Sequence, residues 1–392
     1  MINVNRLIHY RYERLQQQIV RHRCDAALLF SSMNLRYASE TLYAAITNMH
    51  SPTRAIFVPA EGKATLFDSA SEIINDLPDY IGEQRESVKL PYFIAGDQSR
   101  IRTAHWVNEL TDLVRQLGAQ VGRIAIDTAE PELVLRLQEA GHRVVNAERI
   151  VERASAVKSD DELACIAASI SVAERGLTRI RENLQPGVTE RELWAQLAFE
   201  NAAQGGHWFE YAILASGVRT NPWGRECSDK VIESGELVGV DTGMIGPHGY
   251  CADISRSFVC SPAKPTREQK RLYQYAMENL AFNIDLIQAG MGFFEFAERS
   301  WAVPEEFRKR RYNSVAHGVG MGNEWPHIPF VDEWEADDQR DGVFEENMVM
   351  AIESCIGRED GRECVKLEEM VVLKQGTCQL LSSFPFESIF VE

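Results

Sequence analysis

The chain contains, at residues 237–259, the stretch LVGVDTGMIGPHGYCADISRSFV, in which two apolar runs flank a turn. The first run ends on Asp241, and the second carries Asp253 beyond the glycine- and proline-containing turn. This pattern predicts a hairpin that places the two carboxylates side by side. Burying an unpaired carboxylate costs several kcal/mol. Two carboxylates in neighbouring apolar strands therefore indicate a shared metal site.

Three more polar residues follow in segments that are otherwise typical of strands. His317 opens the glycine-rich run HGVGMG, Glu353 follows the apolar residues 348–352, and Glu368 lies within VKLEEM. Four carboxylates and one imidazole make a hard, oxygen-rich set that suits one or two divalent ions of Mn, Fe, Co or Zn. The sequence thus predicts a metal-dependent enzyme with five ligands, Asp241, Asp253, His317, Glu353 and Glu368.

Length and composition limit the remaining possibilities. A chain of 392 residues is too long for one core and predicts two domains. The 58 acidic and 41 basic residues give a net charge of −17, which disfavours nucleic acid or an anionic membrane and fits a small cationic or zwitterionic substrate. No apolar run approaches the roughly 20 residues of a membrane helix. Eight cysteines without a C-x-x-C pair are typical of reduced thiols in a cytoplasmic protein.

The two halves of the chain have different patterns, with a boundary near residues 148–158. We therefore expect one domain over 1–155 and a second over 156–392. The first half alternates helix and strand, which predicts an α/β domain. Its expected helices span 6–23, 101–117 and 130–138, and its expected strands span 26–30, 54–58 and 121–126.

The second half is typical of an α+β domain. A helix begins at Ser159 with acidic residues in its first turn, and another begins at Thr189, whose spacing to Glu192 is that of a capping box. Helices are also expected over 267–289 and 294–310. Strands are expected over 208–214, 236–242, 251–260, 348–353, 365–372 and 379–382.

The ligand motifs together resemble a known family. Asp-x-Gly at 241, Asp-Ile-Ser-Arg at 253, His-Gly-x-Gly at 317, Ile-Glu-Ser at 352 and Val-Lys-Leu-Glu-Glu at 365 are similar to the pita-bread family of methionine aminopeptidase, prolidase, aminopeptidase P and creatinase, over residues 155–385. The resemblance implies a creatinase-like N-terminal α/β domain and a pita-bread α+β C-terminal domain. It also implies a dinuclear site formed by the five ligands, in a homodimer.

The peptidases of that family use two further histidines to position the peptide carbonyl and move protons. At the matching places this chain has residues 220–224, which contain no histidine, and Glu324. The longer turn at 246–256, together with Gly-His-Trp at 206 and Thr-Asn-Pro-Trp at 220, resembles the pita-bread dimethylsulfoniopropionate lyases. Those lyases cleave a C–S bond and release dimethyl sulfide and acrylate.

The lyase resemblance implies roles for residues around the ligands. An aromatic wall would hold a sulfonium or quaternary ammonium group by cation–π attraction, and its members are Trp208, Tyr211, Trp223 and Trp325. The lyases carry Asp-Thr-Asp where this chain has Asp-Thr-Gly at 241–243, and an acidic residue where it has Asn323. The candidates for the catalytic acid or base are therefore Tyr312 and Glu324.

Three functions remain open at this point. The first is a metal-dependent lyase that removes a proton beside a metal-bound carboxylate and cleaves a C–S bond. The alternative is a metallopeptidase or amidohydrolase acting on Xaa-Pro substrates or a compact amide. The third is a metal-free or binding-only relative that has kept the fold.

Overall fold

The computed structural model describes residues 2–42, 45–68, 77–335 and 342–390. The chain divides into two compact units, Met1–Ser155 and Ala156–Glu392, which we call the N-terminal and C-terminal units. Each unit has a hydrophobic core of its own.

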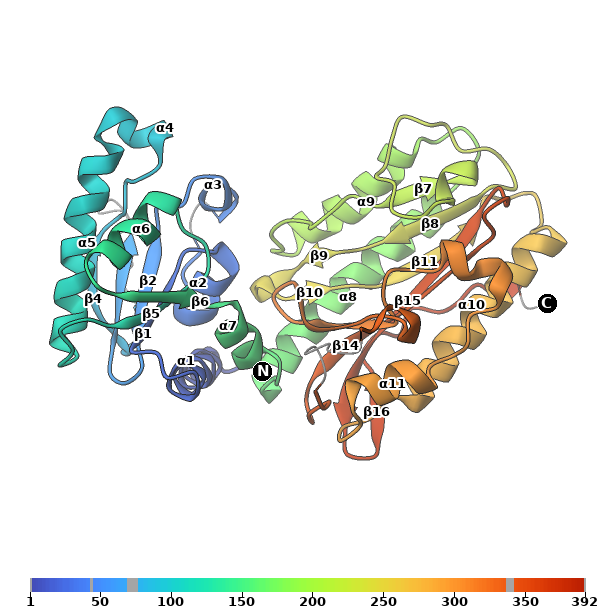
Figure 1. Ribbon diagram of the computed structural model, residues 1–392. Helices are drawn as coiled ribbons and strands as arrows, with labels where there is room; N and C mark the ends of the chain where they lie inside the picture. Colours follow the sequence, from blue (N-terminus) through green and yellow to red (C-terminus); the bar gives the residue numbers. More distant parts are fainter. Residues whose placement is uncertain (1, 43–44, 69–76, 336–341, 391–392) are drawn as a thin grey trace. The chain divides into compact units, whose positions relative to one another are not determined.

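The N-terminal unit contains a mixed sheet (Figure 1). In the described residues its strands lie in the order β4 (Ile81–Glu86), β3 (Ala64–Asp68), β2 (Ala55–Pro59), β1 (Ala26–Leu29), β5 (Arg123–Ile126) and β6 (Arg143–Asn146). The central strand β1 is antiparallel to β2 and parallel to β5. All four residues of β1 are buried, because the strand is covered on both faces.

The N-terminal unit also contains several helices. They are α1 (Val4–Arg21), α2 (Ser32–Ser39), α3 (Ala45–His50), α4 (Tyr92–Ala95), α5 (Ser99–Gln116), α6 (Pro131–Glu139) and α7 (Glu148–Ser155). Trp106 and Leu110 of α5 and Leu133 of α6 share a core with Leu28 of β1 and Phe57 of β2. The predicted helices and strands of this half are confirmed, with ends that differ by a few residues.

The C-terminal unit is built on three groups of strands. The largest sheet has the order β13 (Asn323–Ile328), β12 (Ala316–Val319), β14 (Val349–Gly357), β15 (Cys364–Lys374) and β16 (Thr377–Leu380) in the described residues. A second sheet consists of β11 (Ser255–Val259), β8 (Leu237–Asp241) and β7 (Leu214–Ser216), and β11 lies against β15. The strands β9 (Met244–Ile245) and β10 (Cys251–Ala252) form the hairpin that the sequence predicts.

Helices pack on these strands. They are α8 (Asp160–Asn183), α9 (Glu190–Ala203), α10 (Arg267–Leu286) and α11 (Phe293–Arg299). Helices α8 and α9 pack against each other, and α10 lies across β14 and β15. Capping boxes at Ser159 and Thr189 start α8 and α9, and the one at Thr189 is the one that the sequence predicts.

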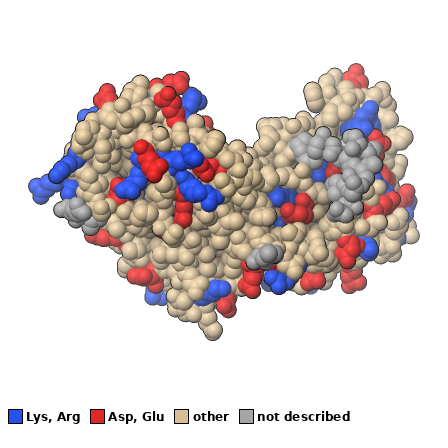
Figure 2. All heavy atoms as spheres, turned by 180° about the vertical axis from the view of Figure 1, so that it is seen from behind, with Lys and Arg blue, Asp and Glu red and all other residues tan. Residues whose placement is uncertain are grey.

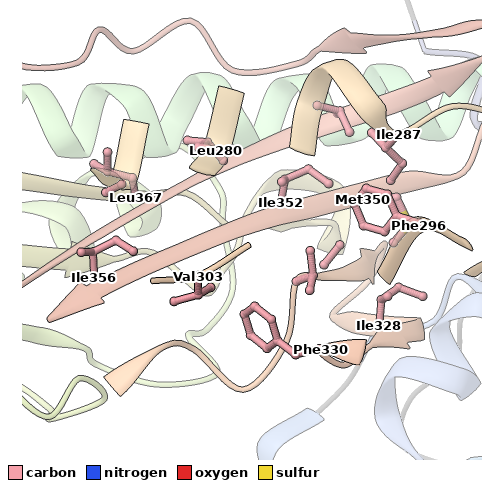
Figure 3. Packing of buried hydrophobic residues seen from close by; sticks show 14 of the residues in the cluster. Leu280, Ile287, Phe296, Val303, Ile328, Phe330, Met350, Ile352, Ile356 and Leu367 are labelled. Atoms are coloured by element: carbon pink, nitrogen blue, oxygen red, sulfur yellow. The ribbon is translucent and has the colours of Figure 1, made fainter. Parts of the chain in front are cut away.

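Alternation along the central strands separates the core from a polar interior. Met350 and Ile352 of β14 and Leu367 of β15 point into the core beside Leu280 of α10 (Figure 3). Neighbouring residues of a strand point to opposite faces. The residue that follows Ile352, Glu353, therefore faces away from this core.

Three predicted elements are wrong in extent. Only Leu214 of the expected strand 208–214 belongs to a strand. Residues 207–210 run beside β9 and make only isolated backbone hydrogen bonds with residues 243–245, such as the one that Glu210 N–H donates to the Gly243 carbonyl. The expected helix 294–310 ends at Arg299, since Pro304 precedes a separate short helical turn. The expected strand 251–260 is interrupted between β10 and β11, at Asp253.

The surface carries mixed charge. On the face drawn in Figure 2, acidic and basic side chains are interspersed, and neither sign covers a continuous area. Within the described ranges, no helix combines the length and the apolar character that crossing a bilayer requires.

Candidate metal centre

The five predicted ligands come from five places in the C-terminal unit. Asp241 ends β8, Asp253 lies between β10 and β11, and His317, Glu353 and Glu368 lie in β12, β14 and β15. All five side chains are buried, and none is more than 6% exposed. Glu353 and Glu368 are directly paired across the β14–β15 ladder. The alternation that sends their neighbours into the core thus sends these carboxylates into one interior site.

His317 lies at one side of this site. Its Nε2 is 3.0 Å from Glu353 Oε1, 3.7 Å from Asp253 Oδ2 and 3.8 Å from Glu368 Oε1. Its Nδ1 lies 3.0 Å from the Gly318 carbonyl oxygen, which orients the ring. Potential ligand atoms of Asp253, His317 and Glu368 all lie within 4.8 Å of one another.

Lys366 lies at the other side and was not among the predicted site residues. Its Nζ is 2.7 Å from Glu353 Oε2, 2.9 Å from Glu368 Oε2 and 3.6 Å from Asp241 Oδ2. It also donates to Ser255 Oγ at 2.8 Å. The side chain is fully buried, so its charge is compensated only by these groups.

Tyr211 connects the first two carboxylates. Its hydroxyl lies 3.1 Å from Asp241 Oδ1 and 2.8 Å from Asp253 Oδ1. The ring fills the space next to Gly243, where an added Cβ would lie 2.5 Å from Tyr211 Cζ. Gly243 also has a positive φ of 37°. A glycine is therefore required here both by the backbone and by the tyrosine ring.

Crowded charges shift the pKa values of the site. Burial, together with the charge of Asp241, raises the pKa of Asp253 to about 7. Burial and the charges of Asp253 and Glu353 raise the pKa of Glu368 well above its usual value. Burial lowers the pKa of His317, but the hydrogen bond and charge of Glu353 outweigh it and raise the value to about 10. The site therefore has an excess of negative charge that a bound cation would relieve.

The donor set fits a divalent metal ion. Glu368 Oε1 is buried and has no hydrogen-bond partner in the described structure. Such an orphaned oxygen is costly unless a cation binds it. Glu353 Oε1 is also buried, and it lies 3.0 Å from His317 Nε2. Glu353 Oε2 lies 2.7 Å from Lys366 Nζ, and ionic attraction to the ammonium stabilises this oxygen although the two groups are poorly aligned for a hydrogen bond.

The four aromatic residues predicted for substrate binding lie in different environments. Tyr211 contacts the ligand carboxylates directly. Trp208 is half-buried and donates from Nε1 to Glu210 at 3.0 Å. Trp223 packs over Gly239 of β8, where a Cβ would collide with its ring. Trp325 packs edge-on against Phe293, at 5.1 Å between ring centres, and belongs to the border of the core.

The two predicted catalytic residues have different surroundings. Glu324 Oε2 is 2.7 Å from Lys158 Nζ, and its Oε1 accepts from the Met321 backbone at 3.0 Å. Both oxygens of Glu324 are thus engaged in holding the turn after β12. The ring of Tyr312 lies 4.6 Å from Lys366 Nζ, next to the carboxylates. Burial and the charge of Glu353 raise the pKa of Tyr312.

Sequence reasoning missed Lys366 and Lys158. Lys366 is two residues before Glu368 in an apolar strand, so the alternation of a strand places both on one face. That signal was available in the sequence. Lys158 pairs with a residue 166 positions away, and no local pattern predicts such a contact.

Comparison with known families agrees with this geometry. Residues 164–375 match the model of metallopeptidase family M24, and residues 11–157 match the creatinase/prolidase N-terminal domain. The Xaa-Pro dipeptidase from Bacillus anthracis has a similar structure, with a TM-score of 0.79 over 97% of this chain and 99% of that one, at 21% identity. These matches confirm the predicted creatinase-like and pita-bread fold.

The sequence is also similar to curated relatives. It is 31% identical to the dimethylsulfoniopropionate lyase DddP of Roseovarius nubinhibens over 98% of this chain and 87% of that protein. It is 29% identical to the Xaa-Pro dipeptidase of Pyrococcus horikoshii over 50% of this chain and 54% of that protein. By its matched domains, its near full-length similarity and its buried carboxylate–histidine site, the chain belongs to metallopeptidase family M24.

Proposed function

We propose that this chain is a metal-dependent lyase that cleaves a C–S bond in a small sulfonium carboxylate such as dimethylsulfoniopropionate. The observation that carries the proposal is the near full-length similarity to the lyase DddP, at 31% identity. The buried cluster of Asp253, His317 and Glu368 supports it, because it offers donor atoms for a divalent ion.

The proposed ligands are Asp241, Asp253, His317, Glu353 and Glu368. A divalent ion bound there would bind the substrate carboxylate and make the adjacent C–H more acidic. Mn, Fe, Co and Zn all suit this set of oxygen and imidazole donors. Gly318 and Ser255 assist by orienting two ligands, since they hydrogen-bond His317 Nδ1 and Glu368 Oε2.

The reaction is an elimination. A base on the enzyme takes the proton from the carbon next to the substrate carboxylate, and that electron pair forms the C=C bond of acrylate. The C–S bond breaks, and its electron pair leaves with sulfur as neutral dimethyl sulfide. The sulfonium charge is cancelled, and the proton stays on the enzyme until water removes it.

Tyr312 is our candidate for the proton transfer, and Glu324 is a weaker one. Tyr312 lies beside Lys366 and the carboxylates. Burial and the charge of Glu353 raise its pKa, so its hydroxyl could accept a proton only if a bound divalent ion offset that negative charge. Glu324 has both oxygens engaged, by Lys158 and by the Met321 backbone. We therefore assign Glu324 to positioning the turn that follows His317, rather than to accepting a proton.

Aromatic side chains would hold the sulfonium group. Tyr211 contacts the ligands, and Trp208 is half-buried nearby in the sequence, so these two are the leading candidates. Trp223 and Trp325 are proposed with less direct support, since they pack against Gly239 and Phe293.

Peptide hydrolysis is the second candidate function. The similarity to Xaa-Pro dipeptidases in fold and in half of the sequence favours it. The residues at 220–224 and Glu324 replace the two histidines that peptidases of this fold use, which argues against it.

We also propose a homodimer in the cytoplasm, with a small zwitterion as its partner rather than nucleic acid or membrane.

A direct assay separates these functions. The metal-loaded protein is incubated with dimethylsulfoniopropionate, and headspace sulfide and acrylate are measured beside proline release from an Xaa-Pro dipeptide. We expect equal amounts of sulfide and acrylate and no proline. Proline release without sulfide would replace the lyase proposal by the peptidase one. Tight binding of the sulfonium substrate without turnover would indicate a binding protein.

A further inference from the structure

Glu353 and Glu368 each direct one carboxylate oxygen towards His317 and the other towards Lys366. Their Oε1 atoms lie 3.0 and 3.8 Å from His317 Nε2, and their Oε2 atoms lie 2.7 and 2.9 Å from Lys366 Nζ. The site therefore has a His317 side and a Lys366 side. A dinuclear centre needs room for one metal ion on each side.

The His317 side offers a complete set of donors for one ion. Asp253 Oδ2, His317 Nε2, Glu353 Oε1 and Glu368 Oε1 face one another there. Both glutamate oxygens are buried, and Glu368 Oε1 has no hydrogen-bond partner within the described residues. Three carboxylate oxygens and one imidazole nitrogen are enough donors to bind one Mn, Fe, Co or Zn ion.

The Lys366 side already holds a cation. An ammonium has three N–H donors, and three oxygens lie within 3 Å of Nζ: Glu353 Oε2 at 2.7 Å, Ser255 Oγ at 2.8 Å and Glu368 Oε2 at 2.9 Å. The side chain is fully buried within strand β15. It cannot leave without exposing its charge to an apolar core.

Asp241 lies on the Lys366 side, with its Oδ2 3.6 Å from Lys366 Nζ. Its Oδ1 shares the Tyr211 hydroxyl with Asp253, at 3.1 and 2.8 Å. Gly243, two residues on, contributes no side chain, and the ring of Tyr211 fills that space. Position 243 therefore offers no carboxylate to a second ion.

We propose that the centre binds a single divalent ion on the His317 side, and that the Lys366 ammonium occupies the place of the second ion. The inference rests on the proposed metal-dependent function, and it narrows the number of ions to one. Lys366 is then a positioning residue, which fixes Glu353 and Glu368 around the bound ion by charge and hydrogen bonds and holds Asp241 beside them by charge.

Metal stoichiometry tests this without reference to activity. The full chain is freed of metal with a chelator, titrated with Mn²⁺ by calorimetry and analysed by elemental mass spectrometry after dialysis. We expect one equivalent per chain and the six-line electron paramagnetic resonance spectrum of isolated Mn²⁺. Two equivalents with a spin-coupled spectrum would overturn the inference and leave the proposed metal enzyme standing. No bound metal would overturn both.

Variants at Lys366 give a second test. Lys366→Ala frees the oxygens on its side, and we expect a second equivalent of Mn²⁺ and a coupled spectrum. Lys374→Ala is the matched control on the same strand, since Lys374 bonds Asn347 outside the site, and it should keep one equivalent. A folded Lys366→Ala variant that still binds one ion would contradict the proposal. If it does not fold, the wild-type stoichiometry decides.

Discussion

Lys158 Nζ lies 2.7 Å from Glu324 Oε2, although 166 residues separate the two in the chain. The lysine side chain is 1% exposed and the glutamate side chain 10% exposed. Glu324 also accepts from the backbone of Met321, and a Cβ at Gly320 would collide with its carboxylate. The pair therefore fastens the turn after His317 to the start of α8.

Breaking this buried pair should destabilise the protein. Lys158→Met leaves the Glu324 charge buried without its partner, and we expect a loss of about 3–5 kcal/mol in the free energy of unfolding. Denaturant unfolding monitored by tryptophan fluorescence measures it. Lys158→Met combined with Glu324→Gln should recover most of the loss, and a double variant as unstable as the single one would show that the ion pair is not the cause.

The same double variant tests whether Glu324 is the catalytic base. Removing a general base typically costs about 10²–10⁴-fold in rate. If Glu324 only positions the turn, the double variant should keep kcat within about tenfold of the wild type, which is smaller than the loss of a base. Sulfide release under saturating substrate measures kcat. A loss of 10³-fold or more in a folded double variant would restore Glu324 as the base.

Tyr312→Phe tests the other candidate. Phenylalanine keeps the ring that faces Lys366 and removes only the hydroxyl. We expect kcat to fall by about 10²–10⁴-fold with little change in KM, because proton transfer is lost while substrate binding is not. Metal content serves as the control and should be unchanged. Wild-type kcat in this variant would exclude Tyr312 from the chemistry.

Removing metal should reduce both activity and stability. The apo site keeps four buried carboxylates, at Asp241, Asp253, Glu353 and Glu368, and Lys366 offsets only part of their mutual repulsion. Dialysis against a chelator should abolish turnover, and Mn, Fe, Co or Zn should restore it. Free metal at 100 times its Kd should stabilise the fold by about 2.7 kcal/mol, seen as a higher Tm. An unchanged Tm and full activity after chelation would contradict a metal enzyme.

The space at Gly243 gives a further prediction. In Gly243→Ala the new Cβ would lie 2.5 Å from Tyr211 Cζ, so the ring must move and its hydroxyl must leave Asp241 and Asp253. We expect weaker Mn²⁺ binding, measured by calorimetry. Gly187→Ala is the matched control, because Gly187 also has a positive φ but nothing within 4 Å of the added Cβ. It should lose about 1–2 kcal/mol of stability through the backbone alone and bind Mn²⁺ normally.

Much of the fold and the ligand set was predictable because the signals are local. The capping box at Thr189 fixes the start of a helix within four residues, and the structure has it there. Glu353 interrupts an apolar strand and Glu368 lies in a strand that is otherwise largely apolar, and strand alternation turns both away from the core. The order of these residues and the family motifs therefore indicated the pita-bread fold from the sequence alone.

Only the tertiary structure decided what surrounds the ligands. The sequence placed Tyr211 in a strand and assigned it to an aromatic wall, whereas packing against Gly243 turns its hydroxyl to Asp241 and Asp253. The sequence suggested Glu324 as a catalytic base, but in the structure its carboxylate is paired with Lys158, which lies 166 residues away in the chain. Local patterns specify strands and caps because those interactions span a few residues. Strand alternation could have placed Lys366 beside Glu368, but its contacts with Asp241 and Glu353 come from strands that meet only after folding, so no local pattern predicted them.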